Sequence, residues 1–238
     1  MARLVEIRGL RFRYPDGTQA LDGVDFALDA GESVALFGAN GSGKTTFAMH
    51  LNGLLEGEGE VQVCGLPATG GNLETIRTKV GMVFQDADSQ LFMPTVLEDV
   101  AFGLLNRGIN PVEAAARART ALAAVGMDQA VDRAPYHLSA GEKKRVALAG
   151  ILVMEPDILV LDEPTTFLDP PAQRVLADLL RGLPQAEIVV THNTLFAQTV
   201  CDRAVFFERG KIAARGSVEE IVAHFDWNFA SQATNFGR

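Results

Sequence analysis

The sequence predicts an α/β fold with three parts: a mostly parallel sheet core, an antiparallel β subdomain and an inserted helical subdomain. Wholly apolar runs at residues 34–37, 158–161, 188–190 and 205–207 predict the core, because strands covered by helices on both faces carry apolar side chains throughout. Alternation of apolar and polar residues near the N-terminus predicts the antiparallel strands. Helix-start signals between about residues 86 and 156 predict the helical part.

The antiparallel strands come first along the chain. Residues 5–8 alternate between apolar and charged side chains, and in residues 24–29 the apolar Val24, Phe26 and Leu28 alternate with Asp25 and Asp29. Such a period of two indicates strands with one buried face. Residues 61–63, which lie between Gly59 and Gly65, indicate a further short strand.

Capping residues mark the expected helix starts. Thr95 is followed three residues later by an acid, the capping-box spacing, and Asn110 precedes Pro111 at a first-turn position. Ser217 marks a final short helix in the same way. Helices are therefore expected after each of these residues.

We expect a single domain over residues 1–238, because no internal repeat or low-complexity linker divides the chain. Its sheet core is predicted over about residues 1–85 and 157–238, and its helical lobe over about residues 86–156. Hydrophobic residues make up 47% of the chain, enough for a large core.

Composition argues against several classes of function. The net charge is −9 and there is no dense basic run, so no nucleic-acid partner is expected. Cys64 and Cys201 are too few and too far apart for a disulfide framework or a zinc site, and we expect reduced thiols. The longest apolar run, residues 146–154, is about half the roughly 20 residues of a membrane-spanning helix, so the chain is not expected to cross a membrane.

Residues 38–45 fit the phosphate-binding loop pattern G-x-x-x-x-G-K-[ST], between the strand at 34–37 and a helix predicted at 45–52. Backbone N–H groups of such a loop converge on phosphates, Lys44 reaches the β- and γ-phosphates, and the Thr45 hydroxyl ligates Mg²⁺. The nucleotide-binding residues expected here are Gly38, Ala39, Asn40, Gly41, Ser42, Gly43, Lys44, Thr45 and Thr46.

Two carboxylates, Asp162 and Glu163, follow the apolar run at 158–161. They are therefore expected at the carboxyl edge of the sheet, where open α/β sheets bind their ligands. Asp162 is the predicted Mg²⁺ ligand, and Glu163 is the predicted general base that polarises the attacking water.

Ser139 is the second residue of the segment Leu-Ser-Ala-Gly-Glu, which lies between the phosphate loop and the two carboxylates, and Glu142 stands at the capping-box position. A helix start with a small open cap can bind an anion. A well-capped helix without any ligand explains the same spacing, so the spacing alone leaves both interpretations open.

The phosphate loop, Gln85, the Ser139 motif, Asp162–Glu163 and His192, in this order, resemble the ATP-binding cassette (ABC) family of ATP hydrolases. The resemblance covers nearly the whole chain. It implies a P-loop NTPase sheet core with an antiparallel and a helical subdomain, and ATP and Mg²⁺ as ligands. It also implies a second ABC subunit, because members of the family close two subunits over two ATP molecules.

The same resemblance implies residues that act across the dimer. Ser139 and Gly141 would contact the γ-phosphate held by the opposite subunit, and Asp169 would contact that subunit directly. Asp169 before Pro170 is also a sensible helix cap, so both interpretations stand for it.

Three further roles are implied by the resemblance. Gln85 would join the catalytic group, touching Mg²⁺ and the attacking water, and His192 would contact the γ-phosphate. Tyr14 would stack on adenine, although a tyrosine at a strand end is an equal alternative. With Glu163, the expected catalytic set is Glu163, His192 and Gln85, and the expected metal set is Thr45, Gln85 and Asp162.

Two positions depart from the family pattern. Ala140 stands where glycine is usual in the Ser139 motif, and its methyl group is expected to tighten packing slightly. Phe167 stands where a small residue is common. Neither removes a group expected to contact phosphate.

Residues 83–92 and 94–103 resemble the ATPases of energy-coupling-factor importers, most closely those for cobalt and nickel. This implies peripheral attachment at the cytoplasmic face of the cell membrane, with integral membrane coupling and substrate-binding subunits as partners. Leu91, Phe92 and Met93 are expected to be exposed, where they would suit a groove for a coupling helix; packing in the core is an equal alternative for each.

Other functions stay open at this point. Vitamin importers of the same group, such as those for biotin, often pair two different ATPases, whereas metal importers usually use two copies of one, which favours a homodimer here. A soluble ABC ATPase acting on DNA or ribosomes is less favoured, because the chain has one cassette and no sustained heptads. A small-molecule kinase is disfavoured by the Ser139 motif and by Asp162–Glu163.

Overall fold

The computed structural model describes residues 2–227. Residue 1 and residues 228–238, which the single-domain prediction also includes, lie outside the described residues.

A six-stranded sheet forms the centre of the described structure, in the order β10-β9-β3-β8-β7-β6. All neighbouring pairs are parallel except β9 and β10. The strands are β3 (Ser33–Phe37), β6 (Val80–Val83), β7 (Ile158–Asp162), β8 (Ala186–Val190), β9 (Arg203–Glu208) and β10 (Lys211–Gly216). The parallel core predicted from the apolar runs is confirmed, and the segments that follow β3, β6, β7 and β8 meet at one edge of the sheet.

The antiparallel subdomain is a second sheet, in the order β2-β1-β4-β5. Its strands are β1 (Arg3–Arg13), β2 (Gln19–Asp29), β4 (Glu58–Val63) and β5 (Leu66–Pro67), and every pairing is antiparallel. The prediction from the alternating residues is confirmed.

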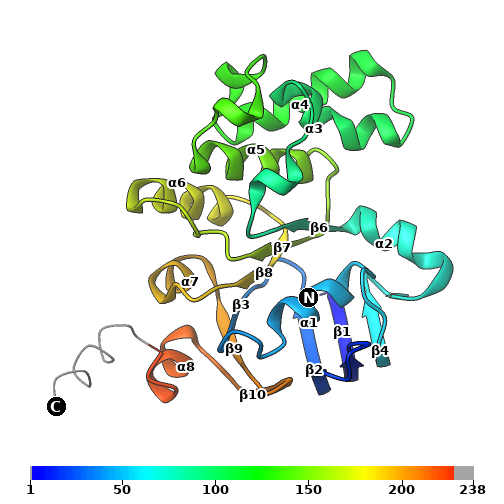
Figure 1. Cartoon of the computed structure of the whole chain (residues 1–238), viewed down its shortest axis with the longest axis vertical. Coiled ribbons are helices and arrows are strands. Elements are labelled where there is room, and N and C mark those ends of the chain that lie inside the picture. The colour runs from blue at the N-terminus through cyan, green and yellow to red at the C-terminus, as the bar shows by residue number, and fades with distance from the viewer. Residues whose placement is uncertain (1, 228–238) are drawn as a thin grey trace.

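The helices cover both sheets and form the helical lobe. They are α1 (Lys44–Leu51), α2 (Leu73–Lys79), α3 (Val96–Asn106), α4 (Pro111–Ala124), α5 (Ala140–Leu152), α6 (Pro170–Arg181), α7 (Thr194–Val200) and α8 (Val218–His224), with 3₁₀ turns η1 (Gly70–Asn72), η2 (Ala87–Gln90), η3 (Asp128–Ala130) and η4 (Pro135–His137). Both halves of the capping box are present at Thr95, Ser139 and Ser217, as the sequence predicts. Figure 1 shows α3, α4 and α5 together at one end of the molecule, far from β1, β2 and β4.

Side chains alternate between the two faces of the central sheet. Val34 and Leu36 of β3 pack with α1 and the antiparallel sheet, whereas Ala35 and Phe37 pack with α7 and α8. The helical lobe has a separate core built from α3, α4 and α5. The central sheet is therefore held from both faces, which fixes the edge where the loops converge.

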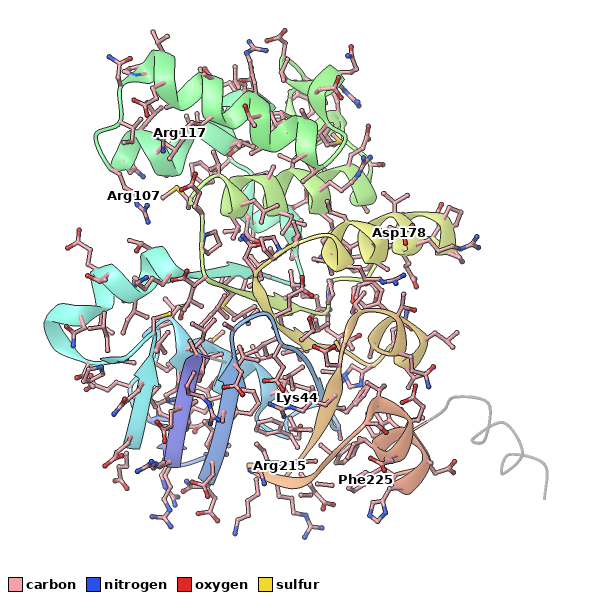
Figure 2. All side chains as sticks on the ribbon, turned by 180° about the vertical axis from the view of Figure 1, so that it is seen from behind. Lys44, Arg107, Arg117, Asp178, Arg215 and Phe225 are labelled. Carbon is pink, nitrogen blue, oxygen red and sulfur yellow. The ribbon has the colours of Figure 1, made fainter. Side chains whose placement is uncertain are left out.

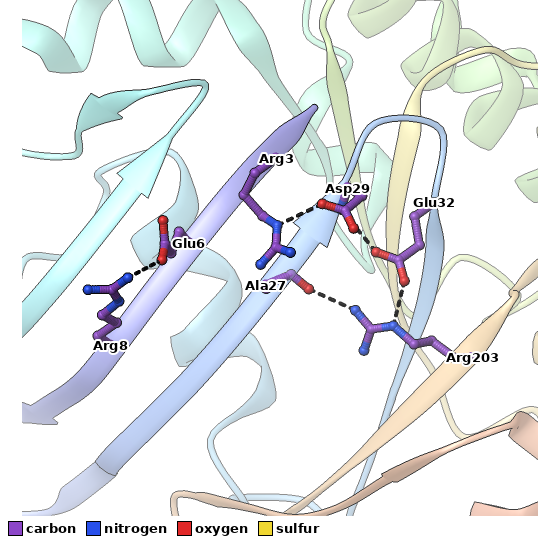
Figure 3. A network of polar contacts seen from close by, with 7 residues as sticks. All are labelled: Arg3, Glu6, Arg8, Ala27, Asp29, Glu32 and Arg203. Carbon is purple, nitrogen blue, oxygen red and sulfur yellow. Dashed lines mark hydrogen bonds and ion pairs between the residues drawn. The ribbon is translucent and has the colours of Figure 1, made fainter. Parts of the chain in front are cut away.

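Ion pairs on one side of the molecule tie the two sheets together (Figure 3). Arg203 of β9 donates from Nε to Glu32 at 2.6 Å and from its terminal nitrogen to the carbonyl oxygen of Ala27 in β2 at 2.7 Å. Glu32 also accepts from the backbone N–H of Asp29, which pairs with Arg3 at 2.7 Å.

The sequence interpretation missed the helices α2 and α7 and the strands β5, β6 and β10. β6 has only four residues and includes Gly81, where an added Cβ would lie 2.0 Å from Ile151. A short strand with a glycine required by packing has too few apolar positions to show a period.

Candidate nucleotide-binding site

The loop between β3 and α1 has a backbone that two of its glycines make possible. Gly38 has φ +137°, and a Cβ there would lie 2.2 Å from the carbonyl oxygen of Phe207; Gly43 has φ +108°, and a Cβ there would lie 2.6 Å from that of Ala20. Side chains at these positions would clash with backbone. The loop therefore wraps closely around the start of α1, where backbone N–H groups can bind an anion; within the loop, the Ser42 N–H donates to the carbonyl oxygen of Ala39 at 3.1 Å.

Lys44, the first residue of α1, is buried within the loop. Its Nζ donates to the carbonyl oxygens of Gly38 at 2.6 Å and Ala39 at 3.0 Å. Burial lowers the pKa of Lys44, while the nearby carboxylates of Glu163 and Asp162 raise it. A phosphate would give this buried ammonium an anionic partner.

Asp162 ends β7 beside the start of α1. The Thr45 hydroxyl donates to Asp162 Oδ2 at 3.1 Å, and burial raises the pKa of the Asp162 carboxyl. Hydroxyl, carboxylate and amide oxygens are the ligands that Mg²⁺ prefers. Thr45, Asp162 and Gln85 line the same cavity, so their donor set fits that ion.

Glu163 follows Asp162 with a backbone φ of +46°, a left-handed conformation that costs energy for a residue with a side chain. Its N–H donates to the carbonyl oxygen of Val190 at 2.8 Å, which fixes the turn against β8. Burial, opposed by a hydrogen bond from the His192 backbone, raises the pKa of Glu163 to about 7. Its Oε1 makes no hydrogen bond in the described residues, although His192 Nε2 is 3.3 Å away.

His192 follows β8 and reaches the phosphate loop. Its Nε2 lies 3.1 Å from Asn40 Oδ1, and since an amide oxygen only accepts, this contact places the hydrogen on Nε2. Burial and the Lys44 charge both lower the pKa of His192, which favours the neutral ring.

These side chains surround one cavity of about 360 Å³. At its outer end the Tyr14 hydroxyl lies 3.0 Å from Thr46 Oγ1, which orients the half-buried tyrosine ring. Of the predicted site residues, the cavity is lined by Tyr14, Asn40, Gly41, Gly43, Lys44, Thr45, Thr46, Gln85, Asp162, Glu163 and His192, and also by the unpredicted Thr18, Gln19, Ala20 and Val190. The central position of Lys44 is visible in Figure 2.

Six predicted residues do not line this cavity: the loop residues Gly38, Ala39 and Ser42, and the more distant Ser139, Gly141 and Asp169. Ser139 and Gly141 line a separate hollow of about 160 Å³ with Leu168 of the segment before α6. Ser139 caps α5, accepting from the Glu142 N–H at 3.3 Å while its own N–H donates to Glu142 at 2.8 Å. Asp169 caps α6 by accepting from the Ala172 N–H at 2.9 Å.

Comparison with known proteins decides the family. The model of the "ABC transporter" family matches residues 21–166. The chain belongs to the ABC transporter family. It is therefore a cassette of an ATP-hydrolysing family, whose members bind ATP, generally with Mg²⁺.

Two curated relatives extend the match over most of the cassette. A putative ABC transporter ATP-binding protein of Streptomyces avermitilis is 52% identical over 92% of this chain and 84% of its own length. The energy-coupling factor transporter ATP-binding protein EcfA of Methanosphaera stadtmanae is 44% identical over 93% of this chain and 82% of its own.

Two solved structures share the ABC fold. CbiO1 from Clostridium perfringens, described as part of the ABC transporter complex CbiONQ, aligns with a TM-score of 0.85 and 34% identity, over 95% of this chain and 93% of its own. The ATP-binding cassette MJ0796, described as dimeric in a post-hydrolysis state with ADP and Pi, aligns with a TM-score of 0.81 and 27% identity, over 90% and 99%.

Within residues 2–227 of this ABC cassette, no helix has the length and apolar character to cross a membrane. The three apolar residues expected to be exposed after Gln85 differ among themselves. Phe92 is 63% exposed, but Leu91 packs against two core clusters and Met93 is half-buried, so the expectation was wrong for these two. Leu91 has an extended backbone, with φ −114° and ψ 106°, and successive side chains of an extended segment point to opposite sides.

The two departures from the ABC pattern both lie at the surface. Phe167 is 80% exposed with φ +66°, a conformation that a small residue such as glycine would adopt at less cost. Ala140 is exposed as the first residue of α5, so its methyl group tightens no packing within the chain.

One polar contact escaped the sequence interpretation. Lys144, four residues after Ala140 on α5, is buried and donates from Nζ to the carbonyl oxygens of Phe84 at 3.1 Å and Gln85 at 2.6 Å. A lysine beside an apolar helical stretch is the available signal, but nothing in the sequence says which carbonyls it reaches.

Proposed function

We propose that this chain is the ATP-hydrolysing subunit of an energy-coupling-factor importer for cobalt or nickel ions, and that it works as a homodimer. The observation that carries the proposal is the division of the site into two surfaces. Lys44 and Glu163 lie in one cavity, whereas Ser139 lies in another. A second copy can supply the missing Ser139 surface, which one copy does not bring to its own cavity.

The first half of the proposed site binds and orients the nucleotide. The loop N–H groups and Lys44 would hold the phosphates, and Tyr14 would contact the adenine. Thr45, Asp162 and Gln85 would hold Mg²⁺, which neutralises phosphate charge when it is bound. When phosphate binds, the Lys44 ammonium would donate to the phosphate instead of to the two loop carbonyl oxygens that it contacts in this structure.

The second half of the proposed site handles the water. Glu163 lines the cavity and is fixed by its backbone bond to Val190, so its carboxylate is placed to accept a proton from an attacking water. The His192 imidazole would contact the γ-phosphate, and Gln85 would contact the attacking water. From the opposite subunit, the N-terminus of α5 at Ser139 and Gly141 would stabilise the phosphate charge, with Asp169 beside it.

The importer assignment is supported by likeness. The relative named EcfA covers 93% of the chain, and CbiO1 is described as part of a CbiONQ complex. On the cassette itself, exposed Phe92 stacks edge-on against Phe102 at 5.0 Å between centroids, a surface that an apolar coupling helix would fit. We propose that integral membrane coupling and substrate-binding subunits hold the cassette there, at the cytoplasmic face of the membrane.

The proposal is tested by capturing tagged Glu163→Gln from detergent-solubilised native membranes in the presence of ATP and Mg²⁺. A coupling protein without a second ATPase is the expected result, together with ATP-dependent uptake of ⁵⁷Co²⁺ by vesicles in which the identified membrane subunits are combined with the wild-type chain in place of the trapped variant. Recovery of a second, different ATPase, with biotin uptake instead, would replace the metal assignment by a vitamin importer. Absence of any membrane protein would overturn the transport function.

A further inference from the structure

The catalytic cavity has a neighbour that no sequence motif indicates. Trp227, the single tryptophan of the chain, lies against the His192 ring with 5.8 Å between ring centroids and 25° between planes. This is offset stacking, a favoured arrangement for aromatic rings. At the edge of the same imidazole, Nε2 lies 3.1 Å from Asn40 Oδ1 and 3.3 Å from Glu163 Oε1.

The end of α8 places the indole there. The Trp227 N–H donates to the carbonyl oxygen of Val222 at 2.9 Å and the Asp226 N–H to that of Ala223 at 3.4 Å, while Asp226 has φ +49°. This pair of bonds around a left-handed residue is the Schellman motif. It reverses the chain so that the next side chain, Trp227, returns onto the sheet.

The other surroundings of Trp227 are rigid. Its ring meets Phe206 of β9 edge-on at 5.1 Å and 84°, and Phe206 stacks on Phe225. These residues belong to the core cluster between the central sheet, α7 and α8. Figure 2 shows Phe225 at the end of α8, beside that core. The indole is thus anchored on the fold and presents one face to His192.

Trp227 also lies behind the phosphate loop. A hollow of about 380 Å³ is lined by Trp227, Phe225 and loop residues 39–42. Asn40 and Gly41 line both this hollow and the nucleotide cavity. The indole therefore lies between this hollow, which it lines, and the His192 ring, on which it stacks.

We propose that Trp227 is a positioning residue for His192: its indole holds the imidazole plane so that Nε2 stays directed at Asn40, Glu163 and the γ-phosphate position. The inference rests on the function proposed above for His192. Trp227 itself touches no reacting atom. It acts by restricting the rotation of the half-exposed His192 ring. The imidazole therefore keeps the orientation that hydrolysis requires from one turnover to the next.

Steady-state ATPase kinetics of the full chain test the proposal with matched variants. Trp227→Ala is expected to lower kcat by about three- to tenfold, the range for loss of one aromatic contact, with KM for ATP within a factor of about two because nucleotide-binding groups are untouched. Trp227→Phe, which keeps a flat ring, is expected to restore most of kcat. Wild-type kcat in Trp227→Ala, or a change in KM alone, overturns the proposal.

The turn at Asp226 supplies a second pair that leaves the indole intact. Asp226→Val puts a β-branched residue at positive φ, which is strongly disfavoured, and should lower kcat as Trp227→Ala does. Asp226→Gly suits the same backbone and should keep the wild-type value. Equal activities of the two Asp226 variants would contradict the positioning role.

Fluorescence separates this inference from the proposed function and does not depend on activity. Because Trp227 is the single tryptophan, the emission of the protein reports on its indole alone. Removing the imidazole with His192→Ala should expose the indole face to water and shift the emission to longer wavelength. Unchanged emission would overturn the stacking. If His192→Ala hydrolyses ATP at the wild-type rate, the proposed function of His192 fails. If His192→Ala is slow while Trp227→Ala is not, only the role of Trp227 fails.

Discussion

The Nζ of Lys144 lies 2.6 Å from the backbone carbonyl oxygen of Gln85. The lysine is on α5, the helix that Ser139 caps, and Gln85 lines the cavity around Lys44. The buried Lys144 ammonium therefore links two parts of the protein. One is α5, whose N-terminus is proposed to complete the partner's site, and the other is the Gln85 segment, which contributes to this subunit's own site. The same ammonium holds the backbone carbonyl of Phe84 at 3.1 Å, so α5 contacts both residues at this end of β6.

Replacing Lys144 by Met should destabilise the chain. The carbonyl oxygens of Phe84 and Gln85 would lose a charged donor, and leaving buried acceptors without a partner costs about 1–3 kcal/mol. Urea denaturation would measure the change in the free energy of unfolding. Lys143→Met is the matched control: its partner Asp88 is 66% exposed, and such pairs contribute about 0–1 kcal/mol. Equal losses in the two variants would contradict the anchoring role of Lys144.

Glu163→Gln should keep ATP binding while hydrolysis falls by about 10²–10⁴-fold, the usual contribution of a positioned general base. Glutamine preserves the size of the side chain, and the backbone bond to Val190 is unaffected, so the fold is retained. Phosphate release at saturating ATP measures the rate, and equilibrium binding of labelled ATP measures affinity. Turnover within a factor of about three of wild type would mean that another group accepts the proton.

Local signals in the sequence predicted the helix caps and the strand ends of this molecule, but they did not predict its long-range contacts. The capping boxes at Thr95, Ser139 and Ser217 need only a spacing of three residues, and all three are formed. The carboxyl ends of the strands also placed Lys44 and Glu163 at one cavity, because parallel strands align their ends.

Contacts between elements distant in the chain carried no such signal. The Lys144–Gln85 bond spans 59 residues, and the Trp227–His192 contact depends on a helix end that folds back on the sheet. The left-handed backbone of Glu163 arises from a turn that a hydrogen bond to β8 holds in place. A glutamate in the sequence does not indicate such a conformation. Periodicity reports burial on one element and says nothing of which partner a side chain meets.

Ser139→Arg should block ATP-driven dimerisation. A long charged side chain at the start of α5 would occupy the surface proposed to meet the partner's phosphates. Size-exclusion chromatography of the Glu163→Gln chain with ATP and Mg²⁺ should give a dimer, and the double variant should remain a monomer. Ser217→Arg in the same background is the control, because it removes an equivalent cap, worth about 0.5–2 kcal/mol, from α8. A dimer formed equally by both double variants would refute the role of the Ser139 surface.

Glu187 gives the protein a pH-dependent stability that is separate from catalysis. It lies in the middle of the central sheet on β8, is 2% exposed, and its Oε1 makes no hydrogen bond in the described residues. Burial, with the nearby Asp202 charge, raises the pKa of Glu187 from 4.5 to about 8. The folded chain therefore holds this proton between about pH 4.5 and 8, whereas the unfolded chain releases it.

Stability should accordingly fall as pH rises through that window, because unfolding then releases a proton. A pKa unit corresponds to about 1.4 kcal/mol, so the penalty grows to several kcal/mol by pH 8. Glu187→Gln has no such proton to lose. In urea denaturation it should match wild type at pH 5 and exceed it by about 2–4 kcal/mol at pH 8. Exposed Glu56→Gln should show no comparable trend. A constant difference between Glu187→Gln and wild type from pH 5 to 8 would show that Glu187 is ionised in the folded chain.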